Sequence, residues 1–162
     1  MARWLRLTAL VVLIDQISKL AVENTMAYGQ RISVLPVFDL TLVYNRGAAF
    51  SFLAQGSGWQ RWFLVLVALL AIVFILWLMR TQANHSTRHM FSLTLILSGA
   101  IGNLIDRVVH GHVIDFLLLY WHNWYYPAFN VADMAITFGA IVLIWDELCR
   151  WRAARRSGVD HE

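Results

Sequence analysis

The sequence is poor in cysteine and in charge. Its one cysteine, Cys149, excludes an intramolecular disulfide, and no CxxC motif or zinc-ligand spacing is present. Charged residues make up 14% of the chain, against about 25% in an average soluble domain, and the net charge is only +3. No basic groove with interleaved aromatic residues, internal repeat or low-complexity segment is present. These absences argue against a disulfide scaffold, a cysteine-ligated zinc module and a protein that binds nucleic acid.

Apolar residues are in excess instead. They make up 59% of the 162 residues, with a mean hydropathy of +0.58, whereas soluble domains are about 45–50% apolar. Four apolar runs predict membrane-spanning helices, since about 18 helical residues cover about 27 Å, close to the thickness of a bilayer core. We place these helices at residues 5–22, 62–79, 90–109 and 131–149, within one membrane domain covering residues 1–162. The predicted class is an all-α polytopic membrane protein.

The first apolar run follows Arg3 and Arg6, as the apolar core of a cleaved signal peptide would. It is too long for that, and Asp15 and Lys19 interrupt it, so we expect a helix that stays in the chain. Asp15 and Lys19 are four residues apart and can pair on one helix face. They could form a structural ion pair near the outer end of the helix or support an active site, and the spacing leaves both roles open.

Residues 24–60 predict a small antiparallel sheet on the outer surface of the membrane. Residues 31–44 are rich in β-branched and aromatic residues and partly alternate, as strands do. Pro36 restricts this stretch to a sheet edge or a bend, Asn45-Arg-Gly47 predicts a turn, and residues 48–53 are a second candidate strand. We expect a loop or helix between the third and fourth membrane helices, and a polar, frayed tail over residues 150–162.

Positive charges and tryptophans predict how the chain lies in the membrane. One side of a four-helix arrangement receives Arg3, Arg6, Arg80, Arg88, Arg150, Arg152, Arg155 and Arg156. The other side receives Lys19, Arg31, Arg46, Arg61 and Arg107, spread over two longer segments. The positive-inside rule therefore places both termini in the cytoplasm. Two tryptophan belts at the headgroup level agree with this, with Trp4, Trp77, Trp145 and Trp151 inside and Trp59, Trp62, Trp121 and Trp124 outside.

Two carboxylates lie where burial makes the charged form unfavourable. Asp115 is in the apolar run 112–120, and Asp133 opens the apolar run 131–148. An ionisable group in or at the edge of a membrane segment is a candidate functional residue. Two such groups at the same membrane edge could share one proton, so that the ionised one activates a water and the protonated one acts as general acid. This aspartic-protease chemistry requires no metal, cofactor or covalent intermediate.

Other polar residues are expected at the same level. Asn103 and Arg107 share a face of the third helix with Gly99, and Asn103 needs hydrogen-bond partners because its position is buried. Asn130 could cap the fourth helix and leave Asp133 in its first turn, where the helix dipole favours negative charge. For Asp133 the pattern is thus consistent with a helix-start signal as well as with a catalytic role.

Five segments together resemble lipoprotein signal peptidase, also called signal peptidase II. They are Asp15-Gln-Ile-Ser-Lys19, Tyr44-Asn-Arg-Gly-Ala-Ala-Phe-Ser-Phe52, Gly99-Ala-Ile-Gly-Asn-Leu-Ile-Asp-Arg107, Val113-Ile-Asp-Phe116 and Pro127-Ala-Phe-Asn-Val-Ala-Asp133. Each segment is a weak signal alone, but five in this order, covering nearly the whole chain, are specific.

The resemblance implies a multi-pass aspartic endopeptidase of the bacterial inner membrane with its active site on the periplasmic side. Such enzymes cut diacylglyceryl-prolipoproteins just before the lipidated cysteine, and cyclic peptides such as globomycin-like antibiotics are expected to bind them. The roles implied are a catalytic pair, Asp115 and Asp133, and a set of substrate-binding or supporting residues. That set comprises Asp15, Lys19, Asn45, Gly47, Asn103, Arg107 and Asn130.

Three other functions are alternatives to a peptidase. A metalloprotein could assemble ligands from His110, His112, Asp115, His122 and Asp133, although no HExxH motif is present. A proton-coupled transporter could use intramembrane carboxylates, but four helices without a repeat make a poor transporter. A non-enzymatic membrane scaffold would have no need for Asp115 in an apolar run.

Overall fold

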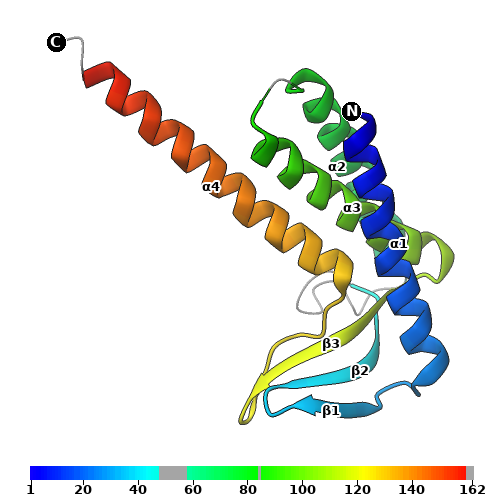
Figure 1. Cartoon of the computed structure of the whole chain (residues 1–162). Helices are drawn as coiled ribbons and strands as arrows, with labels where there is room; N and C mark the ends of the chain where they lie inside the picture. Colours follow the sequence, from blue (N-terminus) through cyan, green and yellow to red (C-terminus); the bar gives the residue numbers. More distant parts are fainter. Residues whose placement is uncertain (48–57, 84, 160–162) are drawn as a thin grey trace.

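Long helices and one small sheet make up the chain in a computed structural model, which describes residues 1–47, 58–83 and 85–159. The helices of the described part are α1 (Ala2–Thr25), α2 (Trp59–Thr81), α3 (Thr87–Val109) and α4 (Val131–Val159). Its strands are β1 (Arg31–Leu35), β2 (Phe38–Asn45), β3 (Val113–Trp121) and β4 (Trp124–Tyr125). The sheet lies at one end of the helices, where α1 ends and α4 begins (Figure 1).

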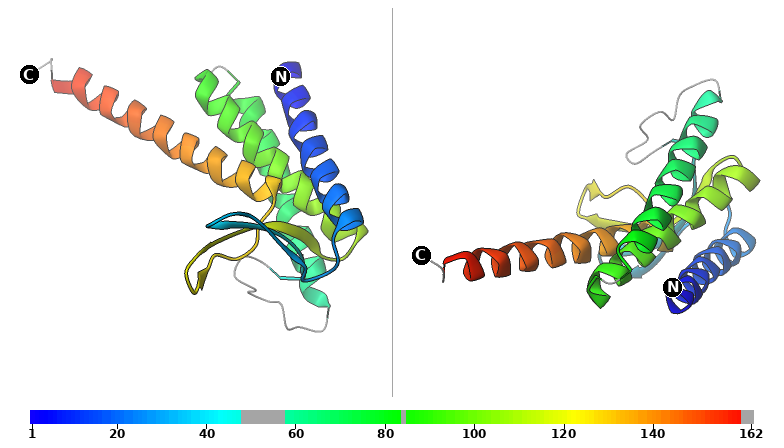
Figure 2. Two further views of the ribbon diagram at one scale, coloured as in Figure 1. Left: turned by 60° about the horizontal axis from the view of Figure 1, so that its bottom comes forward. Right: turned by 90° about the horizontal axis from the view of Figure 1, so that it is seen from above.

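Helix α3 is the centre of the helical part, because it packs against α1, α2 and α4. One core cluster joins Trp4 of α1, Ile75 and Met79 of α2, and Leu93 and Leu97 of α3. At the N-terminal end of α3, Ser86 caps the helix by accepting a hydrogen bond from the backbone N–H of His89. Helix α4 crosses α3 near the sheet and then diverges from the other helices toward its C-terminal end (Figures 1 and 2).

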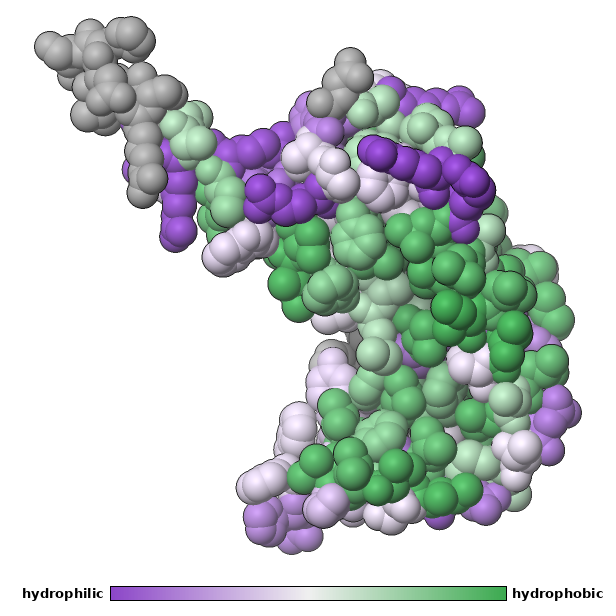
Figure 3. All heavy atoms as spheres, viewed as in Figure 1, coloured by the Kyte–Doolittle hydropathy of each residue, from purple (hydrophilic) through white to green (hydrophobic). Residues whose placement is uncertain are grey.

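The outer face of the helices is apolar. In α2, Leu70 and Val73 are 61% and 64% exposed, and apolar side chains cover the middle of the face shown in Figure 3. Within the described residues, α2 and α3 are the helices long and apolar enough to cross a membrane by length and composition. Seven of the tryptophans are more than half exposed, as an interfacial belt requires. The expectation for Trp4 is wrong, since this side chain is buried in the core cluster.

The sheet is antiparallel with the strand order β1-β2-β3-β4. Strands β1 and β2 form a hairpin whose turn contains Pro36, so the expected bend is present and residues 31–44 form two strands. The candidate strand at residues 48–53 lies outside the described residues. Tyr44 of β2 packs with Leu42, Met26 and Ile114 in a second apolar cluster that joins the sheet to the end of α1.

The segment between α3 and α4 differs from the expected loop or helix. It is the strand β3, which pairs with β2 and is buried along Val113–Phe116 on both faces. A strand buried on both faces has no apolar–polar alternation, and for this reason its pattern did not predict a strand. The register shifts between Leu40 and Val43, and beyond this irregularity Val43 lies opposite Asp115. The strand therefore carries Asp115 into the sheet.

The expected frayed tail is also wrong for residues 150–159, whereas residues 160–162 lie outside the described residues. Helix α4 continues from Val131 to Val159, ten residues beyond the predicted end at residue 149. Arg155 lies over the ring of Trp151 at 3.9 Å, and Arg150 pairs with Asp146 at 3.3 Å. These contacts at helical spacing support a polar segment that has no apolar face of its own.

Candidate active site

Asp115 and Asp133 line the same pocket, which has a volume of about 800 Å³. Asp115 lies on β3 and is 2% exposed, and Asp133 lies in the first turn of α4. Val43, Asn45, Tyr126 and Phe129 are among the other residues that line the pocket. Two carboxyl groups eighteen positions apart in sequence thus line one pocket, because the chain turns back after β3 and leads into α4.

Asn130 links the two carboxyl groups. Its amide nitrogen donates to Asp115 Oδ1 at 2.7 Å, and its amide oxygen accepts from the backbone N–H of Asp133 at 2.9 Å. In return, the backbone N–H of Asn130 donates to Asp133 Oδ2 at 3.3 Å. This reciprocal arrangement is a capping box at the start of α4. The expected cap is present, and the same side chain also contacts Asp115.

Asn103 of α3 holds the other oxygen of Asp133. Its amide nitrogen donates to Asp133 Oδ1 at 2.8 Å. Its amide oxygen accepts from Lys19 Nζ at 3.2 Å and from Asn130 Nδ2 at 3.3 Å. Both ends of this buried amide are therefore satisfied, and its orientation is set by a cation on one side.

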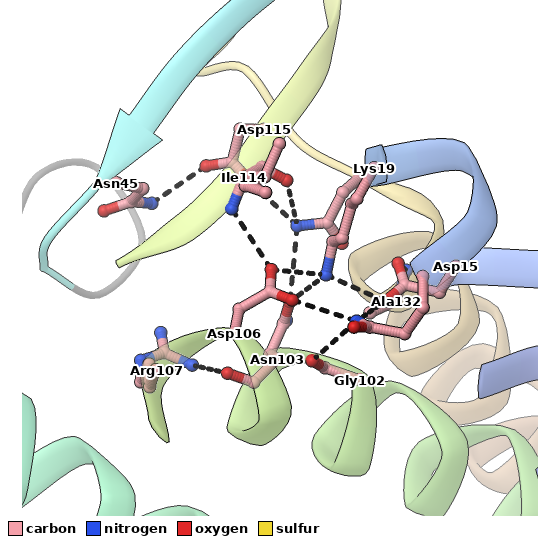
Figure 4. Close-up of polar contacts among 12 residues, drawn as sticks. Asp15, Lys19, Asn45, Gly102, Asn103, Asp106, Arg107, Ile114, Asp115 and Ala132 are labelled. Carbon is pink, nitrogen blue, oxygen red and sulfur yellow. Dashed lines mark hydrogen bonds and ion pairs between the residues drawn. The ribbon is translucent and has the colours of Figure 1, made fainter. Parts of the chain in front are cut away.

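Lys19 lies at the centre of a buried group of charges (Figure 4). The expected pair with Asp15 is present at 2.8 Å, and Lys19 also pairs with Asp106 of α3 at 2.8 Å. Asp15 accepts a 2.8 Å hydrogen bond from the backbone N–H of Ala132, in the first turn of α4. Asp106 accepts from the backbone N–H of Ile114, directly before Asp115, at 3.1 Å. The group therefore joins α1, α3, β3 and α4 around the pocket.

Asp106 and Gln16 were not predicted as site residues. Gln16 donates to Asp106 Oδ1 at 2.9 Å and to the backbone carbonyl of Gly102 at 3.3 Å. Asp106 lies next to Arg107 near a helix end, where an exposed charged residue is the ordinary interpretation of the sequence. Its position three residues after Asn103 was the available signal, since both then face the same side of α3.

Asn45 and Arg107 also line the pocket. The amide nitrogen of Asn45 donates to Asp115 Oδ2 at 3.0 Å, and its oxygen accepts from the backbone N–H of Gly47 at 3.0 Å, which closes the predicted turn. Arg107 donates to the backbone carbonyl of Asn103 at 3.2 Å and to that of Gly47 at 3.4 Å. The guanidinium thus places a positive charge at the pocket without forming an ion pair with either aspartate in the described part of the chain.

The pKa of the Asp115 carboxyl is raised to about 7, chiefly by burial and also by the nearby charge of Asp133. The hydrogen bonds from Asn45 and Asn130 stabilise the ionised form and oppose this shift, as does the charge of Lys19. At neutral pH Asp115 is therefore poised between its protonated and ionised forms, as an acid–base group should be.

Close packing of α3 against α4 sets the position of Asp133. A Cβ atom added at Gly99 would lie 2.2 Å from the backbone oxygen of Ala132, the residue before Asp133. At Gly102 it would lie 2.5 Å from Asp15 Oδ2. Both positions therefore require glycine so that α1 and α4 can approach α3.

The histidines of the metal alternative do not converge on the two aspartates. The His112 ring packs against Tyr44 with centroids 4.2 Å apart, and His122 lies beside Trp121 in the turn between β3 and β4 with a φ of 53°. Within the described ranges, no three His, Cys, Asp or Glu side chains are arranged to hold a metal ion.

Sequence comparison identifies the protein family of this chain. A family model described as signal peptidase (SPase) II matches residues 7–149, the stretch that contains all residues of the candidate site. The chain belongs to the signal peptidase II family. Its relatives include the lipoprotein signal peptidase of Paraburkholderia phymatum, 51% identical over 157 residues that cover 96% of this chain and 93% of the relative. The lipoprotein signal peptidase of Burkholderia mallei is 50% identical over 155 residues, with the same two coverages.

Solved structures agree with this family at the level of the fold. A bacterial membrane enzyme determined by the in meso method at 2.3 Å resolution has a TM-score of 0.83 and 29% identity, and the match covers 91% of this chain and 88% of that one. A second such structure, at 1.9 Å resolution, has a TM-score of 0.81 and 28% identity, with coverages of 91% and 94%. This signal peptidase II family member is thus an aspartic-type membrane peptidase that removes signal peptides from prolipoproteins.

Proposed function

We propose that Asp115 and Asp133 are the catalytic pair and that they cut the peptide bond before a diacylglyceryl-modified cysteine. The observation that carries the proposal is the shared pocket, in which Asn130 hydrogen-bonds to both aspartates. A pair of carboxyl groups in one buried site cannot both ionise readily, so one retains a proton.

The reaction needs only these two groups and water. The ionised carboxylate takes a proton from the water as its oxygen attacks the scissile carbonyl carbon, and the protonated carboxyl donates to the carbonyl oxygen. In the tetrahedral intermediate, the first carboxyl then gives its proton to the amide nitrogen, and the second takes one back from a hydroxyl. The C–N bond breaks, releasing the signal peptide as a carboxylic acid and the cysteine with a free amino group.

The surrounding residues position the pair in this mechanism. Asn45 and Asn130 each donate to one oxygen of Asp115, and Asn103 donates to Asp133. Lys19 and Arg107 supply positive charge that stabilises the net negative site. Gly47 fixes the turn that presents Asn45.

The location of the pocket suits a substrate that arrives within a bilayer. In the proposed arrangement α1 and α4 cross the bacterial inner membrane together with α2 and α3, and both termini are cytoplasmic. The sheet then lies at the periplasmic surface and the pocket at the outer interface. The exposed Trp59, Trp62 and Trp121 near that end support this orientation. The proposed partners are therefore lipidated prolipoproteins and the bilayer, and globomycin-like cyclic peptides would compete for the same pocket.

Reporter fusions test the orientation. Fusions after Gln82, between α2 and α3, should report a cytoplasmic location, and fusions after Ser57 should report a periplasmic one. The reverse pattern would contradict the four-span arrangement.

The catalytic proposal is tested with Asp115→Asn and Asp133→Asn in purified protein. Both substitutions keep the shape of the side chain and remove the titrating group, so each should lower kcat by about 10²–10⁴-fold or more while a lipidated peptide still binds. Asp39→Asn is the matched control, because Asp39 is a buried aspartate on β2 that does not line the pocket. Near-normal cleavage by Asp115→Asn, or loss of activity with EDTA, would overturn the two-aspartate mechanism.

A further inference from the structure

A second cavity lies next to the catalytic pocket. It has a volume of about 400 Å³ and shares Val43 and the segment Tyr126-Pro-Ala128 with the first pocket. Its own end is formed by Arg31 of β1, Thr41 of β2 and Tyr125 of β4. The two cavities therefore adjoin, and together their linings extend from the aspartates to Arg31 on the edge strand of the sheet.

The bilayer sets how a substrate would lie along the two cavities. Ile136 and Thr137, in the second turn of α4, line the catalytic pocket on the helical side, whereas Arg31 lies on the sheet side. A signal peptide is apolar and stays within the bilayer, so it occupies the helical side of the aspartates. The chain on the other side of the cut bond must then leave across the sheet and pass Arg31.

Arg31 presents a cation at the end of the second cavity. Its side chain is exposed, and its guanidinium lies 4.9 Å from the centroid of the Tyr125 ring, which holds it over the cavity. In the register of the sheet it lies directly opposite Thr41, whose side chain is buried. No carboxylate in the described part of the chain forms an ion pair with it, including Asp39 on the adjacent strand. The charge is therefore available to a ligand.

The register of the sheet gives the distance between Asp115 and Arg31. Arg31 is two strands across from Asp115 and two residues along β2 from Val43, the residue opposite Asp115. With strands about 4.8 Å apart and about 3.3 Å per residue, the separation is on the order of 12 Å. An extended substrate covers that distance with about three to four residues.

We propose that Arg31 and the cavity beneath it form a specificity subsite for an acidic side chain at the third or fourth residue of the mature lipoprotein, counting the lipidated cysteine as the first. The inference rests on the proposed function, since it requires cleavage before that cysteine. Arg31 is a specificity residue in this scheme and takes no part in the chemistry.

The experiment uses lipidated peptides that differ only in carrying Asp, Asn or Lys at the third and fourth mature positions. For the unsubstituted enzyme in neutral detergent we expect kcat/KM to fall in the order Asp, Asn, Lys, with Asp above Lys by about threefold to tenfold, as expected for a partly exposed ion pair. Arg31→Glu should invert the order, and Arg31→Met should remove it. Arg80→Glu, an exposed arginine at the far end of α2, should leave the order unchanged.

The outcomes distinguish failure of the proposed subsite from failure of the proposed peptidase activity. Equal cleavage of all three peptides, or an unchanged order in Arg31→Glu, would overturn the subsite while leaving the peptidase activity established. Failure to cut any of the peptides would overturn both. Repeating the assay in mixed micelles with phosphatidylglycerol tests a lipid phosphate as the ligand. If Arg31→Glu changes only the dependence on anionic lipid, Arg31 binds a headgroup and the proposed subsite is wrong.

Discussion

The amide nitrogen of Asn130 donates a 2.7 Å hydrogen bond to Asp115, while the oxygen of the same amide caps the helix that carries Asp133. One fully buried side chain thus sets the position of both carboxyl groups. Its two ends have separable functions, because only the oxygen is needed for capping and only the nitrogen reaches Asp115.

Serine at position 130 separates these functions. Asn130→Ser keeps an oxygen for the cap but loses the bonds from the amide nitrogen to Asn103 and Ile114, so the thermal unfolding temperature in detergent should fall, though less than in Asn130→Ala. Asn130→Ser also removes the donor to Asp115, and the loss of a hydrogen bond to a charged group should lower kcat about 10- to 100-fold. Asn130→Ala removes both functions and should destabilise by about a further 1 kcal/mol. Full activity of Asn130→Ser would show that the bond to Asp115 is dispensable.

The raised pKa of Asp115 predicts the alkaline limit of activity. Because Asp115 loses its proton as the pH rises through about 7, kcat/KM should fall over that range. Stability should change with the same sign. The unfolded carboxyl ionises near pH 4, so the contribution of Asp115 to stability is fully present below that pH and is lost as the pH rises through about 7. Unfolding of Asp115→Asn should lack this part of the pH dependence.

Asn45 offers a way to move that limit. Its amide stabilises the ionised form of Asp115 through the 3.0 Å hydrogen bond, so Asn45→Ala should raise the pKa and shift the fall in kcat/KM to higher pH. Asn24→Ala serves as the control, since this exposed amide donates to the backbone carbonyl of Leu20 and does not line the catalytic pocket. A shift to lower pH in Asn45→Ala would contradict the assignment.

The buried charges around Lys19 predict strong coupling. Lys19→Met leaves Asp15 and Asp106 without a cation and should destabilise by about 3–5 kcal/mol, measured by unfolding in detergent. Asp15→Asn combined with Lys19→Met should cost less than the sum of the two changes, yet remain destabilising because Asp106 still lacks its partner. Arg88→Met, which removes an arginine that is 63% exposed, should change stability by less than about 0.5 kcal/mol. Additive effects of the Asp15 and Lys19 changes would contradict the coupling.

Helix packing at Gly99 predicts an effect on activity through backbone position. Gly99→Ala forces α4 away from α3 at Ala132, so both the unfolding temperature and kcat should fall. Gly139→Ala is the matched control, because its Cβ would meet the backbone oxygen of Ser92 at 2.8 Å, in the same helix pair but farther from Asp133. It should lower stability with a smaller loss of kcat. Equal losses of kcat in the two variants would show that Gly99 has no special relation to the site.

Local patterns in the sequence predicted much of the candidate site, whose catalytic role stays a prediction, because each signal depends on few neighbours. Asp115 was identified because an acid in an apolar run has no solvated role, and Asn130 because a helix start needs a cap. Local patterns could not predict the contacts between residues that are far apart in the sequence. Asp106 pairs with a residue 87 positions earlier in the chain, and only the packing of α1 on α3 brings the two together.

The fold shows the same division. Apolar runs predicted where the helices lie, but β3 was missed because burial on both faces removes alternation. The end of α4 was missed because ion pairs and a cation–π contact hold its polar turns, and these leave no apolar stripe. Trp4 was assigned to the lipid interface from its place in the sequence, whereas the packing of Met79 and Leu93 encloses it.

The capping box of α4 also bears on how the enzyme is synthesised. The chain is made from its N-terminus, and α4 leaves the ribosome after α1, α2 and α3. A nascent chain that has inserted α1 to α3 holds Asp15, Lys19 and Asn103, yet it lacks both Asn130 and Asp133. We expect such a chain to be inert toward every signal peptide near it. Membrane entry of α4 would then be the event that starts proteolysis.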